Sequence, residues 1–386
     1  MIVWILLLFF NLNAAELNEV CVTPNGEQAK CIPINSCHVI RQAIAYLNPE
    51  AIEFAQASQC GYENGPLVCC GSSGRKTTPS PSSTTTPSAQ SVPQPEENFS
   101  LSPLDDQQLP DGTLCGIQIK QRDNRIVGGN ISDIYDFPWM AALKYRKPDG
   151  SDAGFRCGGT LISSRFVLTA AQCLNIRGYD LAEVRLGEWQ ISSSADCVPD
   201  TESAMVCADP VIDLKIVSQI PHPFFSLRSG NNDIALLKLE KKVKFTDFIR
   251  PICLPPPELP IPKEGAMMDI AGWGITENGK QSDYKLKVQV PVLANEKCKK
   301  IYTDYTHINP NQACAGGELG RDACDGDSGG PLMTIFEKKD LFDEDQWYQE
   351  GIIYRGLGCG RRGVPSLYTR ISRYSKWIVN TIHSNM

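Results

Sequence analysis

Cysteine is the residue that most constrains the fold of this chain. The 386 residues include 16 cysteines, of which six lie between residues 21 and 70 and ten between residues 115 and 359. A large, even set is typical of a disulfide framework made in an oxidising compartment. Zinc is the weaker interpretation, because the four histidines are scattered and no short-spaced Cys/His ligand set occurs.

The N-terminus supports that compartment. Residues 1–10 are almost wholly apolar, and Ala14 and Ala15 offer small residues to a signal peptidase, although no Lys or Arg precedes the apolar run. The run is too short to span a bilayer comfortably. We therefore expect a signal peptide over 1–15, a secreted extracellular protein and no membrane anchor.

Charge and sequons add two expectations. The formal net charge of -7 argues against nucleic acid as a partner. Asn98 and Asn130 each begin an Asn-X-Ser sequon, so both are predicted glycosylation sites of a secreted chain.

A segment without cysteines separates the two cysteine groups. Residues 72–110 are rich in Ser, Thr, Pro and Gln, and such a segment cannot bury enough apolar surface to offset its ordering entropy. We expect a flexible linker over 71–114. The small domain before it, residues 21–70, has too small a core to be stable alone, so three disulfides would supply the missing stability. Spacing alone does not select their pairing.

The large C-terminal part is predicted to be β-rich. Short apolar runs at 159–162, 166–169, 233–237 and 286–290 are divided by Gly and Pro turns, which is typical of an antiparallel sandwich or barrel. Over 371–382 the apolar residues recur at helical spacing instead. We therefore expect an all-β body that ends in a helix.

Six local motifs of this part resemble those of the chymotrypsin/trypsin family and occur in that family's order. They read RIVGG at 125–129, LTAAQC at 168–173, NDIAL at 232–236, RPIC at 250–253, GWG at 272–274 and GDSGG at 326–330. The resemblance implies a double antiparallel β-barrel with a C-terminal helix over 126–386, after a light-chain tail at 115–125.

The cysteine spacing of the small domain resembles the clip domain of arthropod haemolymph proteases, including the adjacent Cys69 and Cys70. Together the two resemblances imply a full set of pairs, in which the bond to Cys253 would keep the tail attached after cleavage. The implied pairs are Cys21–Cys69, Cys31–Cys60, Cys37–Cys70, Cys115–Cys253, Cys157–Cys173, Cys298–Cys314 and Cys324–Cys359, with Cys197–Cys207 left to close an extra loop.

The catalytic constellation is incomplete. The family resemblance assigns Asp233 and Ser328 to the triad, but Gln172 stands where the family has histidine. A serine hydroxyl needs a base to remove its proton, and a neutral amide accepts no proton near pH 7. Gly326 and Ser328 match the backbone oxyanion donors. We therefore expect a catalytically silent site.

The specificity pocket also departs from the family. Asp322 matches the position that binds Lys or Arg side chains, and Gly356 keeps the family residue. Tyr354 replaces a small serine, Arg355 replaces an aromatic wall, and Ser366 falls where trypsins use glycine. These larger groups should narrow the slot. One hypothesis is that Arg355 reaches Asp322 and occupies the pocket itself.

The activation machinery matches the family. Cleavage after Arg125 would free the amine of Ile126, which in the family inserts beside the aspartate before the nucleophile, here Asp327. That ion pair would order the oxyanion loop. The resemblance therefore implies a cleavage-driven change of shape even without catalysis.

No cofactor is expected, although one loop raises the question of calcium. Some relatives hold calcium in the matching loop, but acids on a solvated loop are the commoner explanation. The acidic residues concerned are Glu188, Asp196, Asp200, Glu202 and Asp209.

These features together resemble a clip-domain serine protease homologue of arthropod haemolymph. The resemblance implies a cleavage-switched cofactor or regulator in an innate-immune cascade of melanisation or Toll type. Its partners would be an upstream activating protease and active clip proteases or their substrates. One alternative is an active trypsin-like endopeptidase zymogen with a preference for Arg or Lys. Another is a clip domain that binds microbial surfaces or partner proteases.

Overall fold

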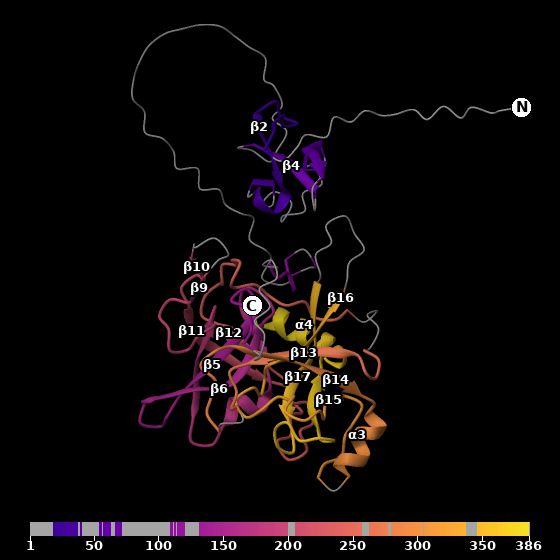
Figure 1. Cartoon of the computed structure of the whole chain (residues 1–386). Helices are drawn as coiled ribbons and strands as arrows, with labels where there is room; N and C mark the ends of the chain where they lie inside the picture. Colours follow the sequence, from indigo (N-terminus) through magenta and orange to yellow (C-terminus); the bar gives the residue numbers. More distant parts are fainter. Residues whose placement is uncertain are drawn as a thin grey trace, which may run out of the picture. The chain divides into compact units, whose positions relative to one another are not determined.

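The chain divides by its internal contacts into two units, residues 1–99 and 100–386, which we describe separately (Figure 1). The computed structural model describes residues 18–37, 39–40, 54–55, 57–62, 66–71, 109–110, 112, 114–119, 131–199, 205–256, 262–276, 279–303, 305–336 and 346–385.

Several sequence predictions fall outside these described residues. They are the signal peptide, the linker up to residue 108, the sequons at Asn98 and Asn130, and the cleavage site at Arg125 and Ile126. Within the described residues, no helix has the length and apolar character needed to cross a membrane.

The small unit is built on an antiparallel four-stranded sheet with the order β1-β2-β4-β3. Three disulfides hold it, and its small apolar core includes Cys37, Ile40, Ala55 and Val68. Its elements are β1 (Val20–Val22), β2 (Gln28–Pro33), the 3-10 turn η1 (Ile34–Ser36), β3 (Gln59–Tyr62) and β4 (Pro66–Cys70).

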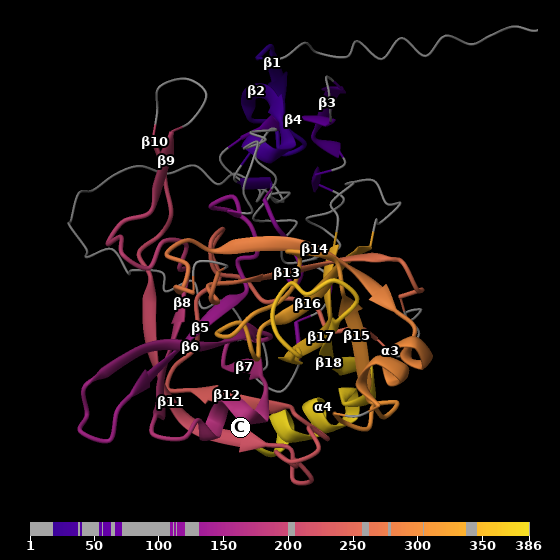
Figure 2. The same cartoon turned by 60° about the horizontal axis from the view of Figure 1, so that its bottom comes forward.

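The large unit contains two closed six-stranded antiparallel barrels, so the predicted fold class is confirmed. Figures 1 and 2 both separate the strands of the first barrel from those of the second. In barrel order, the first comprises β11 (Ile212–Pro221), β12 (Ala235–Leu239), β7 (Phe166–Thr169), β6 (Asp152–Leu161), β5 (Met140–Arg146) and β8 (Asp180–Leu186). The second comprises β13 (Met267–Gly272), β14 (Leu286–Leu293), β15 (Gln312–Gly316), β18 (Pro365–Arg370), β17 (Gln346–Arg355) and β16 (Pro331–Phe336).

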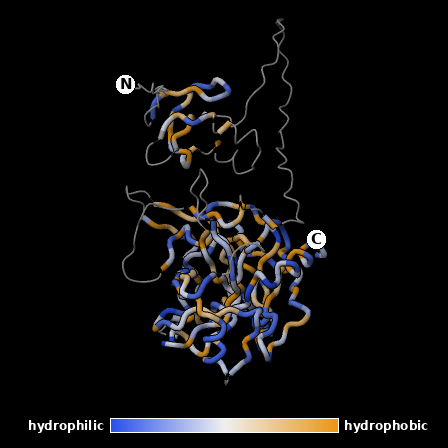
Figure 3. The backbone as a smooth tube through the Cα atoms, turned by 90° about the vertical axis from the view of Figure 1, so that its right-hand side faces the viewer, coloured by the Kyte–Doolittle hydropathy of each residue, from blue (hydrophilic) through white to orange (hydrophobic). Residues whose placement is uncertain are grey.

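Strand sequences explain which face each strand buries. Along β11, exposed and more buried residues alternate, as a strand with one solvated face requires. Four of the five residues of β12 are buried, so this strand is covered on both of its faces. Figure 3 shows the resulting mixture of hydrophobic and hydrophilic stretches throughout the body.

Helical segments occupy the connections and the C-terminus. The 3-10 turn η2 (Ala171–Asn175) follows β7, and α3 (Asn295–Tyr302) follows β14. The predicted C-terminal helix is present as η3 (Ile371–Arg373) and α4 (Ser375–Ser384), and Ile378 and Ile382 are its buried residues. A short hairpin of β9 (Cys197–Pro199) and β10 (Met205–Cys207) lies outside the barrels.

The structure contains eight disulfides, which are the pairs implied by the family resemblance. Cys197–Cys207 ties the β9–β10 hairpin, and Cys115–Cys253 joins the light-chain tail to the body. The others are Cys21–Cys69, Cys31–Cys60, Cys37–Cys70, Cys157–Cys173, Cys298–Cys314 and Cys324–Cys359.

Candidate active site

Elements of both barrels bring the three triad positions together. Gln172 lies on η2 after β7, and Asp233 precedes β12, both in the first barrel. Ser328 lies in the loop before β16 of the second barrel. The loop is pinned on both sides, because the Gly158 N–H donates to the Ser328 carbonyl (2.8 Å) and the Gly329 N–H donates to the Ile353 carbonyl (2.8 Å).

The Gln172 side chain is engaged in a contact that a catalytic base would not make. Its Nε2 donates to the backbone oxygen of Tyr354 at 2.6 Å. The Ser328 hydroxyl donates to the same oxygen at 3.4 Å. A peptide carbonyl cannot take up the hydroxyl proton near neutral pH. The Ser328 hydroxyl therefore has a neutral acceptor, the Tyr354 carbonyl, in place of a base.

Asp233 is completely buried, with one oxygen bonded and the other not. Its Oδ1 accepts the backbone N–H of Gln172 at 2.8 Å, whereas its Oδ2 has no hydrogen-bond partner among the described residues. Burial raises the pKa of this carboxyl to about 7, against the opposing N–H groups of Gln172 and Ala171. In a complete triad an imidazole N–H would bond to this carboxylate and favour its charged form.

Tyr354 is held inside the body rather than in the open cleft. Its side chain is buried in an apolar cluster with Tyr302, Ile308 and Leu367. Burial raises the pKa of its phenol, and the nearby Arg355 lowers it. The ring also lies so close to Gly230, three residues before Asp233, that a Cβ at Gly230 would overlap it.

The hypothesis that Arg355 pairs with Asp322 is wrong. Arg355 is exposed, and its guanidinium lies 5.0 Å from the ring centroid of the adjacent Tyr354. No ion pair links it to Asp322 in the described part of the chain. Asp322 instead accepts the Ser366 hydroxyl at 2.6 Å. Burial raises the pKa of Asp322, against the opposing hydrogen bonds from Ser366 and two backbone N–H groups.

The activation aspartate lies in a backbone cradle. Asp327 accepts the N–H of Gly274 at 2.8 Å and of Cys324 at 3.0 Å, and burial raises its pKa to about 6. A side chain at Gly274 would overlap the carboxylate, so only glycine permits this approach. Gly326 of the oxyanion loop has a φ of +99°, which also favours glycine. The implied partner, the Ile126 amine, lies outside the described residues.

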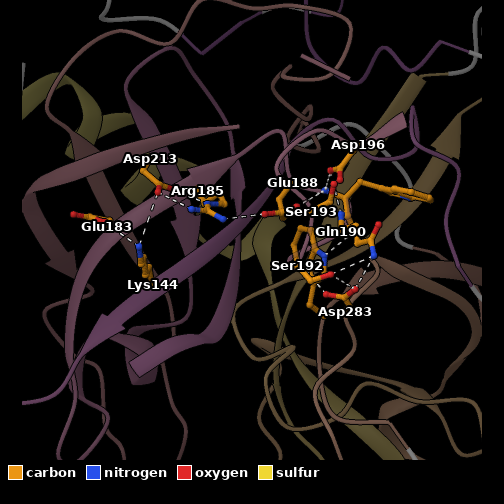
Figure 4. Close-up of polar contacts among 12 residues, drawn as sticks. Lys144, Glu183, Arg185, Glu188, Gln190, Ser192, Ser193, Asp196, Asp213 and Asp283 are labelled. Carbon is orange, nitrogen blue, oxygen red and sulfur yellow. Dashed lines mark hydrogen bonds and ion pairs between the residues drawn. The ribbon is translucent and has the colours of Figure 1, made fainter. Parts of the chain in front are cut away.

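The acidic loop, residues 188–209, is held largely by hydrogen-bond donors of the protein itself (Figure 4). Glu188 pairs with Arg185 at 3.1 Å, and Asp196 Oδ2 accepts the N–H groups of Trp189 and Gln190, each at 3.1 Å. Asp196 Oδ1 is buried without a partner among the described residues. Asp209 is exposed.

The predicted calcium ligands are therefore only partly brought together. Asp200 and Glu202 lie outside the described residues. The described residues contain no set of three His, Cys, Asp or Glu side chains placed to hold a metal ion. The calcium alternative stays a prediction.

Two residues beside this loop carry no signal in the sequence. Asp283 accepts hydrogen bonds from the Gln190 side chain and from both the N–H and hydroxyl of Ser192 (Figure 4). Lys285 is buried, and this burial lowers its pKa to about 8, although Asp136 and other nearby acids raise it. Neither Asp283 nor Lys285 belongs to a sequence motif, so only the contacts in the structure identify them.

Comparison with known proteins agrees with this fold. Residues 126–378 match the family model described as Trypsin, and residues 21–70 match the model described as Regulatory CLIP domain of proteinases. The chain belongs to the CLIP-domain serine proteases of the trypsin family.

Several relatives match over nearly the whole length of the chain. Phenoloxidase-activating factor 1 of Holotrichia diomphalia is 37% identical over 390 residues, covering 99% of this chain and 98% of the relative. Serine protease ea of Drosophila melanogaster is 39% identical, covering 94% of this chain and 91% of the relative. The crystal structure of the Drosophila Grass clip serine protease of the Toll pathway matches with a TM-score of 0.61 at 30% identity, over 96% of this chain and 99% of that one.

Proposed function

We propose that this chain is a secreted, non-catalytic CLIP-domain serine protease homologue. After cleavage between Arg125 and Ile126 it acts as a cofactor or regulator in an extracellular innate-immune protease cascade. The observation that carries the proposal is the pair of hydrogen bonds that Gln172 and Ser328 donate to the Tyr354 carbonyl. They leave the nucleophile without a base.

The size of the expected rate loss supports the absence of catalysis. Loss of the histidine from a triad of this type costs about 10^6 in turnover. Oxyanion and binding effects alone leave about 10^3–10^4 over water.

The cascade role is supported by the relatives and by Asp327. Relatives that span nearly the whole chain are named as phenoloxidase-activating factors, and the matched crystal structure is of a Toll-pathway protease. The backbone cradle of Asp327 and the glycines around it are the parts that a new N-terminal amine would need. The partners would be an upstream activating protease and the active clip proteases or substrates of the same cascade.

Catalytic silence is tested with the cleaved full-length protein. We expect its hydrolysis of arginyl and small-residue chromogenic peptides to equal that of a Ser328→Ala variant, which lacks the nucleophile. Turnover reproducibly above the Ser328→Ala background would establish the alternative, an active endopeptidase, because that background already contains the residual oxyanion and binding effects.

The regulatory role needs a second measurement. Cleaved wild-type protein and an uncleavable Arg125→Gln variant are added separately to a haemolymph fraction, and phenoloxidase and Toll-ligand processing are followed. We expect only the cleaved form to change the rate of phenoloxidase activation or the rate of Toll-ligand processing. Equal rates with both forms would remove the cleavage-switched role.

A further inference from the structure

The loop between β11 and β12 displays apolar side chains that the body does not cover. Phe224 is 76% exposed and Leu227 is 62% exposed. The ring centroid of His222 lies 6.0 Å from that of Phe224 and 5.1 Å from that of the half-buried Trp377 on α4. A single apolar side chain on a surface needs no explanation, but aromatic rings that gather at one place are typical of binding surfaces. We call His222, Phe224 and Trp377 the aromatic patch.

Hydrogen bonds fix the backbone that carries Phe224. Its N–H donates to His222 Nδ1 at 3.2 Å, and its carbonyl accepts Asn232 Nδ2 at 2.8 Å. The His222 N–H donates to the Ile234 carbonyl at 3.0 Å, which ties the loop to the start of β12. Asn232 Oδ1 accepts the Tyr374 hydroxyl at 2.9 Å, which ties the loop to the C-terminal segment. A side chain on a backbone held in this way loses little freedom when a partner covers it.

The exposed charges beside the aromatic patch have one sign. Residues 220–232 contain Arg228, and residues 371–385 contain Arg373 and Lys376, whereas neither segment contains Asp or Glu. All three cations are exposed, and no ion pair joins any of them to another residue that the structure describes. The whole chain carries a net charge of -7, so this cationic surface is a local departure from the average. A surface that complements it is acidic.

The C-terminal helix lacks the face that a lipid bilayer would need. The buried residues of α4 are Ile378 and Ile382. Its exposed side carries one apolar residue, Val379, among polar ones such as Lys376 and Asn380. A helix that lies in a membrane surface turns its apolar face outward instead. An aromatic anchor beside a charged rim is the usual composition of a protein–protein contact.

We propose that the aromatic patch and the cations beside it form a docking surface for an acidic polypeptide segment of a partner protein. An apolar side chain of that segment packs on Phe224, and its carboxylates pair with Arg228 and with the cations of residues 371–385. The proposal goes beyond the function proposed above, because this surface needs neither catalysis nor cleavage in order to bind.

The test uses a fluorescein-labelled peptide of two Glu-Asp-Phe-Glu-Asp-Leu repeats, whose binding to the full-length protein is followed by fluorescence anisotropy. A second peptide carries Ser in place of Phe and Leu, so it keeps the charge alone. The variants are Phe224→Ser, Phe224→Tyr, which keeps the ring, and Arg228→Glu. Tyr305→Ser and Arg362→Glu are matched controls, because both residues are exposed and lie in loops of the second barrel.

We expect the apolar acidic peptide to bind Phe224→Ser at least about tenfold more weakly than the wild type, because loss of an aromatic anchor removes much of the binding free energy. For Arg228→Glu we expect binding weaker by about threefold at low salt, since rim charges contribute less. Phe224→Tyr and both controls should bind as the wild type does. The wild type should bind the Ser-containing peptide about tenfold more weakly than the apolar one.

Several results would overturn the proposal. One is a wild type that does not bind the apolar acidic peptide, and another is equal binding by the wild type and Phe224→Ser. Equal binding of the two peptides would make the surface a general polyanion site. Sedimentation of the wild type, but not of Phe224→Ser, with phosphatidylserine-containing vesicles would make it a lipid surface.

The result is independent of the proposed lack of catalysis. Anisotropy reports binding at the aromatic patch whether or not the protein turns over a substrate. Hydrolysis by the wild type would refute the proposed function and leave the docking surface intact. Equal binding by the wild type and Phe224→Ser would refute the docking surface and leave the proposed function intact.

Discussion

At the scale of single residues, the departure from catalysis involves more than one substitution. Gln172 removes the base, and the change leaves Asp233 Oδ2 buried and unbonded among the described residues. Tyr354 adds a buried ring beside the site, which requires glycine at position 230. Restoring histidine alone would therefore leave a cleft whose neighbours have already been repacked.

The charge state of Asp233 predicts a pH-dependent cost. Its folded pKa of about 7 lies above the ordinary value of 3.8, so the folded state keeps a proton that the unfolded state releases as pH rises. The contribution of the Asp233 carboxyl to the free energy of unfolding is fully present below pH 4 and is lost as the pH rises through 7. We expect Asp233→Asn to be more stable than the wild type by on the order of 3 kcal/mol at pH 8 and little different at pH 4. Urea unfolding at both values measures this, and a constant difference would contradict it.

The packing of Tyr354 on Gly230 predicts strong coupling between the two positions. Gly230 has a φ of +66°, so an alanine there suffers both from the left-handed backbone and from its overlap with the ring. We expect Gly230→Ala to cost at least about 3 kcal/mol in the wild type. In a Tyr354→Ser background only the backbone cost of about 1–2 kcal/mol should remain. Thermal unfolding of the wild type, the two single variants and the double variant measures the coupling energy between positions 230 and 354. Additive effects of the two substitutions would show that the Tyr354 ring does not pack on Gly230.

At the scale of elements, the acidic loop is fastened to the strand start of β14. Trp189 donates its indole N–H to the Ser132 carbonyl at 2.9 Å, and the Lys285 N–H donates to the Trp189 carbonyl at 2.8 Å. The Ser132 N–H in turn donates to the Lys285 carbonyl at 2.8 Å. The loop is thereby tied to the segment that follows the activation site by six residues. The loop, the residue before β14 and Ser132 therefore belong to one network of hydrogen bonds.

Asp283 is the side chain that fastens the loop most directly. Its three hydrogen bonds to Gln190 and Ser192 measure 2.7–2.8 Å. We expect Asp283→Ala to lower the free energy of unfolding by about 1–3 kcal/mol and to speed amide hydrogen exchange at Ser192. Asp180→Ala, an exposed acid at the start of β8, is the matched control. Unchanged exchange at Ser192 would mean that the backbone alone holds the loop.

At the scale of the whole molecule, a disulfide and several hydrogen bonds attach the light-chain tail to the body. Cys115 bonds to Cys253, and Gln346 Nε2 donates to the carbonyls of Gly112 (2.6 Å) and Cys115 (3.1 Å). The Gly116 N–H donates to the Pro251 carbonyl at 2.8 Å, and the Gly116 carbonyl accepts the N–H of Trp347 at 2.9 Å. Activation at Arg125 would therefore separate two chain ends without releasing a fragment.

This attachment predicts how the cleaved protein behaves in denaturant. We expect the wild type, cut after Arg125, to run as one molecule in concentrated urea and as two only after reduction. A Cys115→Ser/Cys253→Ser variant should lose its N-terminal fragment in concentrated urea without reductant, because only hydrogen bonds and packing remain. Size-exclusion chromatography distinguishes the two. Release of the fragment from the cut wild type without reductant would contradict the disulfide.

The sequence by itself determined the fold and the missing base. Motifs such as GDSGG at 326–330 and the spacing of the cysteines are local patterns, which the order of residues along the chain displays directly. Through the family resemblance that they carry, these patterns imply the double barrel and the position of Gln172, whereas the apolar runs by themselves indicate only an antiparallel sandwich or barrel. The same patterns make the family recognisable from the residues alone.

Only the tertiary structure decided what the neighbouring side chains do. One hypothesis from the sequence places Arg355 at Asp322, but its guanidinium lies near the Tyr354 ring, and the Ser366 hydroxyl donates to the Asp322 carboxylate instead. Those outcomes depend on rotamers and on contacts between residues far apart in the chain, such as Tyr354 with Gly230. Packing and burial select them once both barrels have closed, so no local pattern encodes them.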